Sequence, residues 1–265
     1  VQLPDEWDVS LAEFNVGITA AVETDKCNSE WADSVNKMDL VIVPSTHVKK
    51  TLEQSGDITT KIIVIHESFY NEIVVEDKDH LGLELSTNFN FLIVGQVTGD
   101  NPDNDRKNIF NTLKWMCEAF KDDKDVGIIL KTNHGKNTQI DRQLTKKVIN
   151  DLTNEIRKGD YPKIHLVHGH LTPGEMSSIY KMKNTKCLVS LTRGEGFGLP
   201  LLESAACGLP IIATNWSGHL DFLKRGKFIP VNYVLSKIPD GRVDNRIFIK
   251  DTKWAEAIES DFKKK

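Results

Sequence analysis

The sequence has few cysteines and none of the long apolar runs that mark membrane spans. Its four cysteines are far apart and form no C-x-x-C pair, so a disulfide framework or a cysteine metal site is not expected, and a reducing compartment fits best. No apolar run approaches the roughly 18 residues of a membrane span, and the start V-Q-L-P-D-E-W does not have a signal-peptide layout. We therefore expect a soluble, cytoplasmic protein without stable membrane insertion.

An excess of positive charge is also missing. The 265 residues carry 34 basic and 38 acidic side chains, a formal net charge of -4, which does not favour general binding of nucleic acid. Any site for an anion must therefore be local. The length allows one large or two modest domains, each able to bury a core.

Strand and helix patterns alternate in two blocks separated by a polar stretch. The first block predicts a helix from about Thr46, which Ser45 can cap. Residues 76–88 break the periodicity and are interpreted as an interdomain connection. Strands are predicted at 15–21, 39–44 and 61–65 in the first block, and at 89–95, 126–131, 163–168, 187–191 and 210–214 in the second.

The helices of the second block have clear signals. Thr172-Pro173-Gly174-Glu175 is a capping box with proline at the first helical position. Repeated strand and helix units of this size predict a parallel sheet with right-handed crossovers. One apolar helix face is formed by Ile109, Leu113, Met116, Cys117 and Phe120.

The most informative segment, residues 194–210, reads G-E-G-F-G-L-P-L-L-E-S-A-A-C-G-L-P. It places Glu195 before a predicted helix and Glu203 within it, after a buried strand and a glycine turn. In an open parallel sheet, ligands bind beyond the carboxyl ends of the strands, and a helix N-terminus offers free N–H groups to an anion. The turn at 196–198 is therefore a candidate cradle for a phosphate or a sugar.

A second constellation is the adjacent pair Arg106 and Lys107, which follows the loop Q-V-T-G-D-N-P-D-N-D. Two cations at the start of a helix are unfavourable unless an anion compensates them, which suggests a bound phosphate. Arginine offers a planar fork and lysine a mobile point charge, so together they suit a diphosphate. The alternative is a solvated charge pair beside an acidic loop.

Three histidines at 165, 168 and 170 alternate as on a strand, which raises the question of a metal site. His168 and His170 would share a face, but no third ligand is visible nearby in the sequence, so a metal site is not favoured. Lys131 ends a predicted strand and points from its carboxyl edge, where it is a candidate for contact with phosphates.

With these motifs in this order, residues 89–218 resemble the carboxy-terminal domain of retaining glycosyltransferases of family 4, which have the GT-B fold. The family signature is E-x7-E with G-F-G-L-P between the carboxylates and A-C-G-L-P-I-I-A-T after it. The first block is similar to the end of that family's amino-terminal domain, through N-V-G-I-T-A-A-V-E-T-D and N-K-M-D-L-V-I-V-P-S. The resemblance implies an α/β chain of GT-B type, with a partial amino-terminal Rossmann-like domain at 1–80 and a complete carboxy-terminal one at 81–265.

The resemblance also implies roles for individual residues. Glu203 would accept hydrogen bonds from the ribose hydroxyls of the donor, and Glu195 would contact hydroxyls of the donor sugar. Arg106 and Lys107 would stabilise the diphosphate leaving group, so no metal or other cofactor is expected. The glycine turn would bring backbone N–H groups to sugar and phosphate, and the loop after residue 168 would line the nucleobase. The implied donor-binding residues are Gly196, Phe197, Gly198, Leu199, Lys131, His170 and Leu171, together with Glu203.

The chain also departs from the family pattern. Gly95-Gln96 stands where many members have Gly-Arg, and Val22-Glu23-Thr24 stands where the amino-terminal block often presents a histidine to the acceptor. Glu23 is the weak candidate for that acceptor-side role. Only three strands are apparent before residue 76, so the chain looks truncated or unusually reduced at its start.

These observations predict a retaining glycosyltransferase. It would use a nucleotide diphosphate sugar as donor and a glycan, lipid or other small molecule as acceptor, with no nucleic-acid partner. Two alternatives stay open: a non-catalytic protein that binds nucleotide sugars or glycans, and another GT-B enzyme acting on nucleotide sugars, such as an epimerase.

Overall fold

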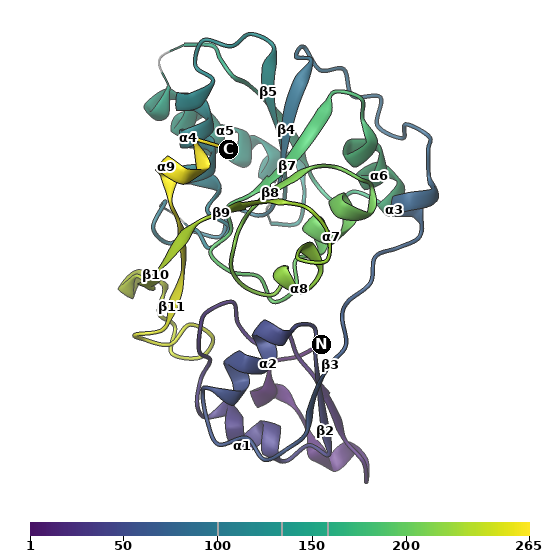
Figure 1. Cartoon of the computed structure of the whole chain (residues 1–265), viewed down its shortest axis with the longest axis vertical. Helices are drawn as coiled ribbons and strands as arrows, with labels where there is room; N and C mark the ends of the chain where they lie inside the picture. The colour runs from purple at the N-terminus through teal and green to yellow at the C-terminus, as the bar shows by residue number, and fades with distance from the viewer. Residues whose placement is uncertain (100, 134, 158) are drawn as a thin grey trace.

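The computed structural model describes residues 1–99, 101–133, 135–157 and 159–265 (Figure 1). Its first part is a three-stranded parallel sheet in the order β1-β2-β3, which packs with two helices at the bottom of Figure 1. The core of this part is formed by Trp31, Val35, Val41, Val43 and Leu52, among others. The bounds are η1 Pro4–Glu6, η2 Val9–Leu11, β1 Val16–Ile18, α1 Trp31–Asn36, β2 Leu40–Val43, α2 Thr46–Glu53 and β3 Ile62–Val64.

The second part is a six-stranded parallel sheet in the order β6-β5-β4-β7-β8-β9. Every residue of the inner strands β5 and β8 is buried, as expected for strands covered on both faces. The bounds are β4 Phe89–Val94, β5 Val126–Thr132, β6 Lys163–His168, β7 Thr185–Ser190, β8 Ile211–Thr214 and β9 Ile229–Val231.

Helices cover both faces of this sheet. Helices α4 (Ile109–Ala119), α5 (Gln139–Ile156) and α9 (Glu259–Phe262) pack on one face through a single apolar cluster. Helices α3 (Glu72–Val75), α6 (Pro173–Lys181), α7 (Leu199–Ala206) and α8 (Leu220–Leu223) pack on the other. The order of the strands reverses at β4, between β5 and β7, which is where ligands bind in folds of this kind.

A hairpin of β10 (Tyr233–Lys237) and β11 (Lys253–Ala257), with η3 (Asp240–Arg242) between its strands, joins the two parts. Figure 1 shows it running from the large sheet toward the first part of the chain. There the carbonyl of Lys253 accepts from Asp25 N–H, the N–H of Lys253 donates to Asp25 Oδ1, and Arg246 forms ion pairs with Asp5 and Glu6. The hairpin therefore bridges segments that are more than two hundred residues apart in the sequence.

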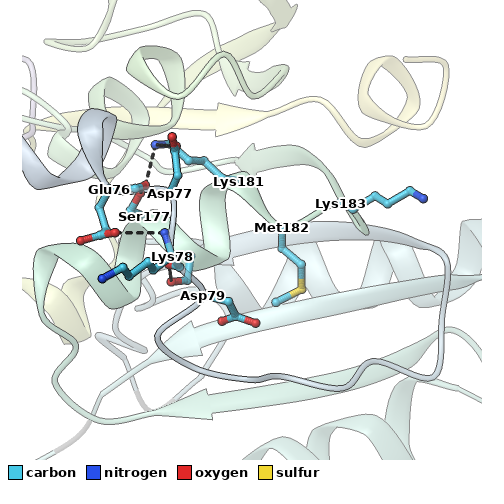
Figure 2. A pocket seen from close by; sticks show the side chains of 9 residues that line it. Glu76, Asp77, Lys78, Asp79, Ser177, Lys181, Met182 and Lys183 are labelled. Atoms are coloured by element: carbon cyan, nitrogen blue, oxygen red, sulfur yellow. Dashed lines mark hydrogen bonds and ion pairs between the residues drawn. The ribbon is translucent and has the colours of Figure 1, made fainter.

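Residues 76–88 contain no helix or strand and lie against α6. Lys181 donates to the backbone carbonyls of Val74 and Glu76, and Ser177 Oγ to those of Ile73 and Glu76. These bonds satisfy carbonyls that the short helix α3 leaves unpaired. Figure 2 shows Lys181 and Ser177 beside Glu76 and Asp77. A cavity of about 220 Å³ here is lined by 76–79 and by residues of α6 and its end, and by no predicted site residue.

The sequence patterns located all eight strands that they predicted, with small shifts at the ends. Ser45 caps α2 by accepting from Val48 N at 3.2 Å, and Thr172 and Glu175 form the predicted capping box of α6. The first predicted strand, at 15–21, is too long: β1 ends at Ile18 because residues 19–24 leave the sheet and turn toward the second part of the chain. Strand β9, the β10–β11 hairpin and helices α1, α3, α8 and α9 were not predicted.

Candidate functional site

The loop between β7 and α7, residues 191–198, contains the glycine turn predicted to be a cradle. Gly198 precedes the first residue of α7 with a φ of 99°, a left-handed conformation that favours glycine. Glu195 lies in this loop, buried, with its N–H donating to Ser217 Oγ at 2.9 Å. Pro200 lies in the first turn of α7, as predicted.

Free backbone N–H groups are present at this turn. Within the described part of the chain, no hydrogen-bond acceptor is found for the N–H groups of Phe197, Gly198 and Leu199. Leu199 begins α7, whose positive dipole end points toward the turn. Three unpaired donors at a helix N-terminus make a binding place for an anion.

Arg106 and Lys107 lie beside this loop, each facing a carboxylate. Lys107 Nζ donates to both oxygens of Glu195, at 2.7 and 2.9 Å. Arg106 Nη1 lies 3.1 Å from Glu23 Oε1 and donates to the carbonyl of Gly194 at 3.1 Å. The structure thus brings together the predicted cations, Glu195 and Glu23, from three separate segments of the chain.

Charge in this cluster is balanced by the chain itself. Burial alone would raise the pKa of the Glu195 carboxyl, but the nearby cations Lys107 and Arg106 outweigh burial and hold its pKa below the ordinary value. Glu195 is therefore ionised at neutral pH. Two carboxylates occupy positions around the two cations where an external anion would compete with them.

Helix α4 begins later than the sequence predicted, so Arg106 and Lys107 are not part of it. The helix begins at Ile109, after Asn108 in a left-handed conformation, so the two cations precede it. Its N-terminus is compensated by Asp105, whose carboxylate accepts from Ile109 N at 2.6 Å and Phe110 N at 3.4 Å. An external phosphate is therefore not required to offset the helix dipole. The case for an anion rests instead on the cations themselves.

Glu203 lies on α7, within the motif but outside this cluster of ion pairs. Its Oε2 accepts from the hydroxyl of Tyr180 at 2.8 Å, and Tyr180, on α6, is fully buried. Burial raises the pKa of the Glu203 carboxyl above its ordinary value, although the Tyr180 bond acts in the opposite direction. The carboxylate is thus fixed in orientation and keeps further lone pairs for a ligand.

The loop after β6 contains two further predicted residues, His170 and Leu171, and is contacted by a third, Lys131. Lys131 is buried, and its Nζ donates to the carbonyl of Gly169 at 2.8 Å, so its charge is used to hold this loop. Burial lowers the pKa of the Lys131 ammonium. His170 is exposed and Leu171 half-buried. Their predicted contacts with phosphate and nucleobase stay predictions.

Phe197 has a packing role. It is buried, and its ring lies 5.6 Å from that of His66 and 5.1 Å from that of Phe222. Its side chain therefore anchors the turn by packing between the two rings. Leu199, by contrast, is 37% exposed.

The first part of the chain rests directly on this loop. Ser45 Oγ donates to the carbonyl of Gly196 at 2.6 Å, and Thr46 donates twice to Asp221 Oδ2, at 2.7 Å from its N–H and 2.9 Å from its hydroxyl. A Cβ on Gly194 would lie 2.0 Å from the carbonyl oxygen of Glu23, so only glycine permits this approach. The loops that follow β4, β7 and β8 therefore all meet the first part of the chain.

Neither a metal centre nor a membrane span emerges from the described residues. Among them, no three His, Cys, Asp or Glu side chains come together in a way that would hold a metal ion. Nor does any helix within these ranges combine the length and the apolar character needed to cross a bilayer. Cys27, Cys117 and Cys187 are buried, and Cys207 is half-buried.

Several residues of the site were missed by sequence reasoning. Asp105 had a local signal, since aspartate shortly before an apolar helical pattern is typical of a cap. Tyr180 and Ser217 had none, because their contacts to Glu203 and Glu195 join segments whose relative placement depends on the whole fold. Arg193, which contacts the loop before Arg106, likewise gave no local pattern.

Comparisons with known proteins agree with this architecture. A family model described as glycosyl transferases group 1 matches residues 148–239, which include β6 to β9 and the whole E-x7-E segment. A sequence search of curated proteins gave no match.

Three solved structures illustrate the structural similarity. An α,α-trehalose-phosphate synthase from Burkholderia xenovorans is 8% identical with a TM-score of 0.61, covering 84% of this chain and 57% of its own. HepE from Anabaena, in complex with UDP and glucose, is 14% identical with a TM-score of 0.57, covering 82% and 57%. A sucrose-phosphate synthase from Thermosynechococcus elongatus is 21% identical with a TM-score of 0.56, covering 76% and 47%.

These similarities establish the fold. The α/β class and the GT-B type predicted from the sequence are confirmed, and the chain spans about half the length of the solved structures that it matches. At such low identity, substrates do not follow from the similarity. The family match supports nucleotide-sugar glycosyl transfer, because it covers the segment that holds Glu195 and Glu203.

Proposed function

We propose that the chain is the donor-binding part, or most, of a retaining glycosyltransferase that transfers a sugar from a nucleotide diphosphate sugar. The observation that carries the proposal is the arrangement of Arg106 and Lys107 beside the free N–H groups at the start of α7. Cations on the loop after β4 and oriented N–H groups on the loop after β7 suit the two charged phosphates of such a donor. The family 4 assignment and retention of configuration rest on the E-x7-E pattern.

The same groups account for the proposed chemistry. When the bond between the anomeric carbon and the diphosphate oxygen breaks, negative charge grows on the departing diphosphate. Arg106 and Lys107 are positioned to stabilise that charge without waiting for solvent to reorganise. The proposal assigns no metal or cofactor to this task, because the two side chains supply the positive charge. Glu195 is placed to contact the sugar once Lys107 turns to the phosphate.

The acceptor is proposed to be a glycan or small sugar. HepE, a structural neighbour, is described in complex with UDP and glucose, and the pneumococcal O-GlcNAc transferase GtfA in complex with UDP and GlcNAc. We propose by analogy that this chain also takes a nucleotide sugar and a sugar acceptor. Its acceptor would approach from the first part of the chain, where Glu23 lies. A cytoplasmic location stays a prediction.

Replacing Glu203 with alanine is expected to weaken nucleotide binding by roughly 10- to 100-fold, since a charged acceptor for the ribose hydroxyls contributes about 1.5–3 kcal/mol. The matched control is Tyr180→Phe, which removes the hydroxyl bonded to Glu203 but leaves the carboxylate. Calorimetry of both variants with the preferred nucleotide makes the comparison. Unchanged affinity in Glu203→Ala would show that this carboxylate does not hold the ribose.

Binding through Glu203 should also depend on pH. Burial raises the pKa of Glu203, so this carboxyl takes up a proton at a higher pH than an ordinary glutamate. We expect nucleotide affinity to fall as the pH is lowered from about 7 to about 5, because the protonated group loses acceptor capacity. The Glu203→Ala variant should lose the part of that dependence which this carboxyl causes.

Replacing Glu23 with glutamine is expected to raise affinity for a diphosphate by roughly 2- to 5-fold, because Arg106 would no longer be paired with a competing carboxylate. Glu30→Gln removes an exposed charge from the same part of the chain and serves as the control. Calorimetric titration with UDP measures the effect. A loss of affinity in Glu23→Gln would mean that Glu23 helps to hold the ligand rather than competing with it.

Turnover tests the proposal as a whole. The chain would be incubated with a panel of nucleotide sugars and simple sugars, and both nucleotide release and the anomeric configuration of the product would be followed by NMR. The proposal expects a product with the same anomeric configuration as the donor. Inversion of configuration would contradict the retaining assignment. Absence of both nucleotide-sugar binding and turnover would contradict the proposal.

A further inference from the structure

Arg193 is a buried arginine that lies two residues before Glu195. None of the roles proposed above involves it. Only 2% of its surface is exposed. Its Nη1 donates to three backbone carbonyls of the loop after β4: Pro102 at 2.7 Å, Asp103 at 3.2 Å and Asp105 at 2.7 Å. This one nitrogen, which carries two hydrogens, thus bonds to three carbonyls of the segment that leads into Arg106.

The opposite side of the guanidinium is held by β11. Nε lies 2.7 Å from Glu256 Oε1 as an ion pair, without the geometry of a hydrogen bond. The guanidinium carbon also lies 5.0 Å from the centre of the Trp254 ring. Glu256 is oriented in turn by accepting from Trp254 Nε1 at 2.9 Å. The charge of Arg193 is therefore paired, and its direction toward the loop is fixed.

Backbone bonds place Arg193 between the same segments. Its N–H donates to the carbonyl of Arg106 at 2.9 Å, and its own carbonyl accepts from Ala255 N at 2.9 Å. The loop before Arg106 has no helix or strand of its own from residue 101 to residue 106. Four hydrogen bonds to Arg193 therefore hold the backbone of this loop, and the last of them is accepted by the carbonyl of Arg106, the first proposed phosphate ligand.

We propose that Arg193 is a positioning residue for diphosphate binding. By holding the backbone of residues 102–106, it fixes where the side chains of Arg106 and Lys107 emerge beside Glu195. This inference rests on the proposed function, because it assumes that the two cations bind a diphosphate. Arg193 itself touches no ligand, since its guanidinium is buried among Trp254, Glu256 and the loop carbonyls.

Inorganic pyrophosphate is the probe for this inference, because it tests the cations without depending on the nucleobase or the sugar. Calorimetry would compare the wild-type chain with Arg193→Gln and Arg193→Lys, and the melting temperature of each protein would be recorded. We expect Arg193→Gln to weaken pyrophosphate binding by roughly 10- to 100-fold, the scale on which small misplacements of a functional group act. Arg193→Lys keeps the positive charge beside Glu256 and should recover part of the loss.

Arg242→Gln is the matched control. Arg242 also lies over an aromatic ring, 4.4 Å from the centre of Phe248, in the same hairpin region, and among the described residues its side chain forms no hydrogen bond or ion pair with the loop or the cations. We expect Arg242→Gln to lower the melting temperature without changing pyrophosphate affinity. If Arg193→Gln does not fold, Arg193→Lys carries the test, because it removes the guanidinium nitrogen Nη1 that bonds to the loop carbonyls while keeping the positive charge.

The outcomes distinguish the positioning role of Arg193 from the proposed function of the chain. A selective loss of pyrophosphate affinity in the Arg193 variants supports the positioning role. Folded Arg193 variants with lower melting temperatures but wild-type pyrophosphate affinity would overturn the positioning role and leave the proposed function intact. A wild-type chain with no measurable affinity for pyrophosphate would overturn the proposed diphosphate site, and the positioning role with it.

Discussion

Replacing Arg106 and Lys107 together with alanine is expected to reduce affinity for a nucleotide diphosphate by roughly 100-fold or more, and to leave affinity for the bare nucleoside nearly unchanged. Each cation would donate charge-assisted hydrogen bonds worth about 1.5–3 kcal/mol to the phosphates. In the structure both cations are paired with carboxylates, so the net gain from the ligand is smaller than the gross interaction. Calorimetry with UDP and uridine measures the two affinities.

The control for this double substitution is a second adjacent pair, Lys146 and Lys147, which is exposed on α5. Replacing both with alanine removes the same net charge, so any general effect of charge on binding appears in both proteins. Added salt should reproduce part of the loss in the wild-type chain by screening the cations. If nucleoside and diphosphate affinities fall together in the Arg106 and Lys107 variant, the pair has a structural role instead.

Replacing Gly218 with alanine is expected to disrupt the donor loop and to cause a large loss of nucleotide-sugar affinity. An added Cβ would lie 2.0 Å from the carbonyl oxygen of Gly196, 2.6 Å from its carbonyl carbon and 2.8 Å from the carbonyl oxygen of Glu195. These are backbone atoms, so the clash can be relieved only by moving the loop. Overpacking of this kind costs about 1–3 kcal/mol of stability. Thermal unfolding and calorimetry measure the two effects.

Gly226 provides the matched control, because it lies shortly after α8 and a Cβ there would meet nothing within 4 Å. Gly226→Ala should retain wild-type stability to within about 0.5 kcal/mol, as surface substitutions usually do. It should also retain donor affinity. Wild-type affinity in a stably folded Gly218→Ala protein would contradict the proposed position of the donor at residues 195–199.

The sequence predicted the elements that carry strong local signals. Buried strands such as β5 and β8 are continuous apolar runs, and the capping box at Thr172 marks the start of α6. Strand β9 is different, because Ile-Pro-Val contains a proline, which is tolerated there at the edge of the sheet. The hairpin strands β10 and β11 escaped prediction because they pair with each other across a long irregular segment.

The candidate site was predictable in part. Glu195 and Glu203 lie in one continuous motif, so their spacing and their place around a helix start were readable from the sequence. The partners of the cations were not readable in the same way. Glu23 is far from Arg106 in the sequence, and their contact depends on how the first part of the chain rests on the loop after β7. Long-range ion pairs of this kind leave no local pattern.

The central claim is that the loops after β4 and β7 bind a nucleotide diphosphate through Arg106, Lys107 and the N–H groups at the start of α7. The measurement that tests it most directly is a calorimetric panel of UDP, GDP and ADP, each compared with its nucleoside and its sugar conjugate. The account predicts that one diphosphate binds much more tightly than its nucleoside and that Glu195→Ala weakens only the sugar conjugate. Equal affinity for nucleoside and diphosphate, or no binding of any member of the panel, would contradict the account.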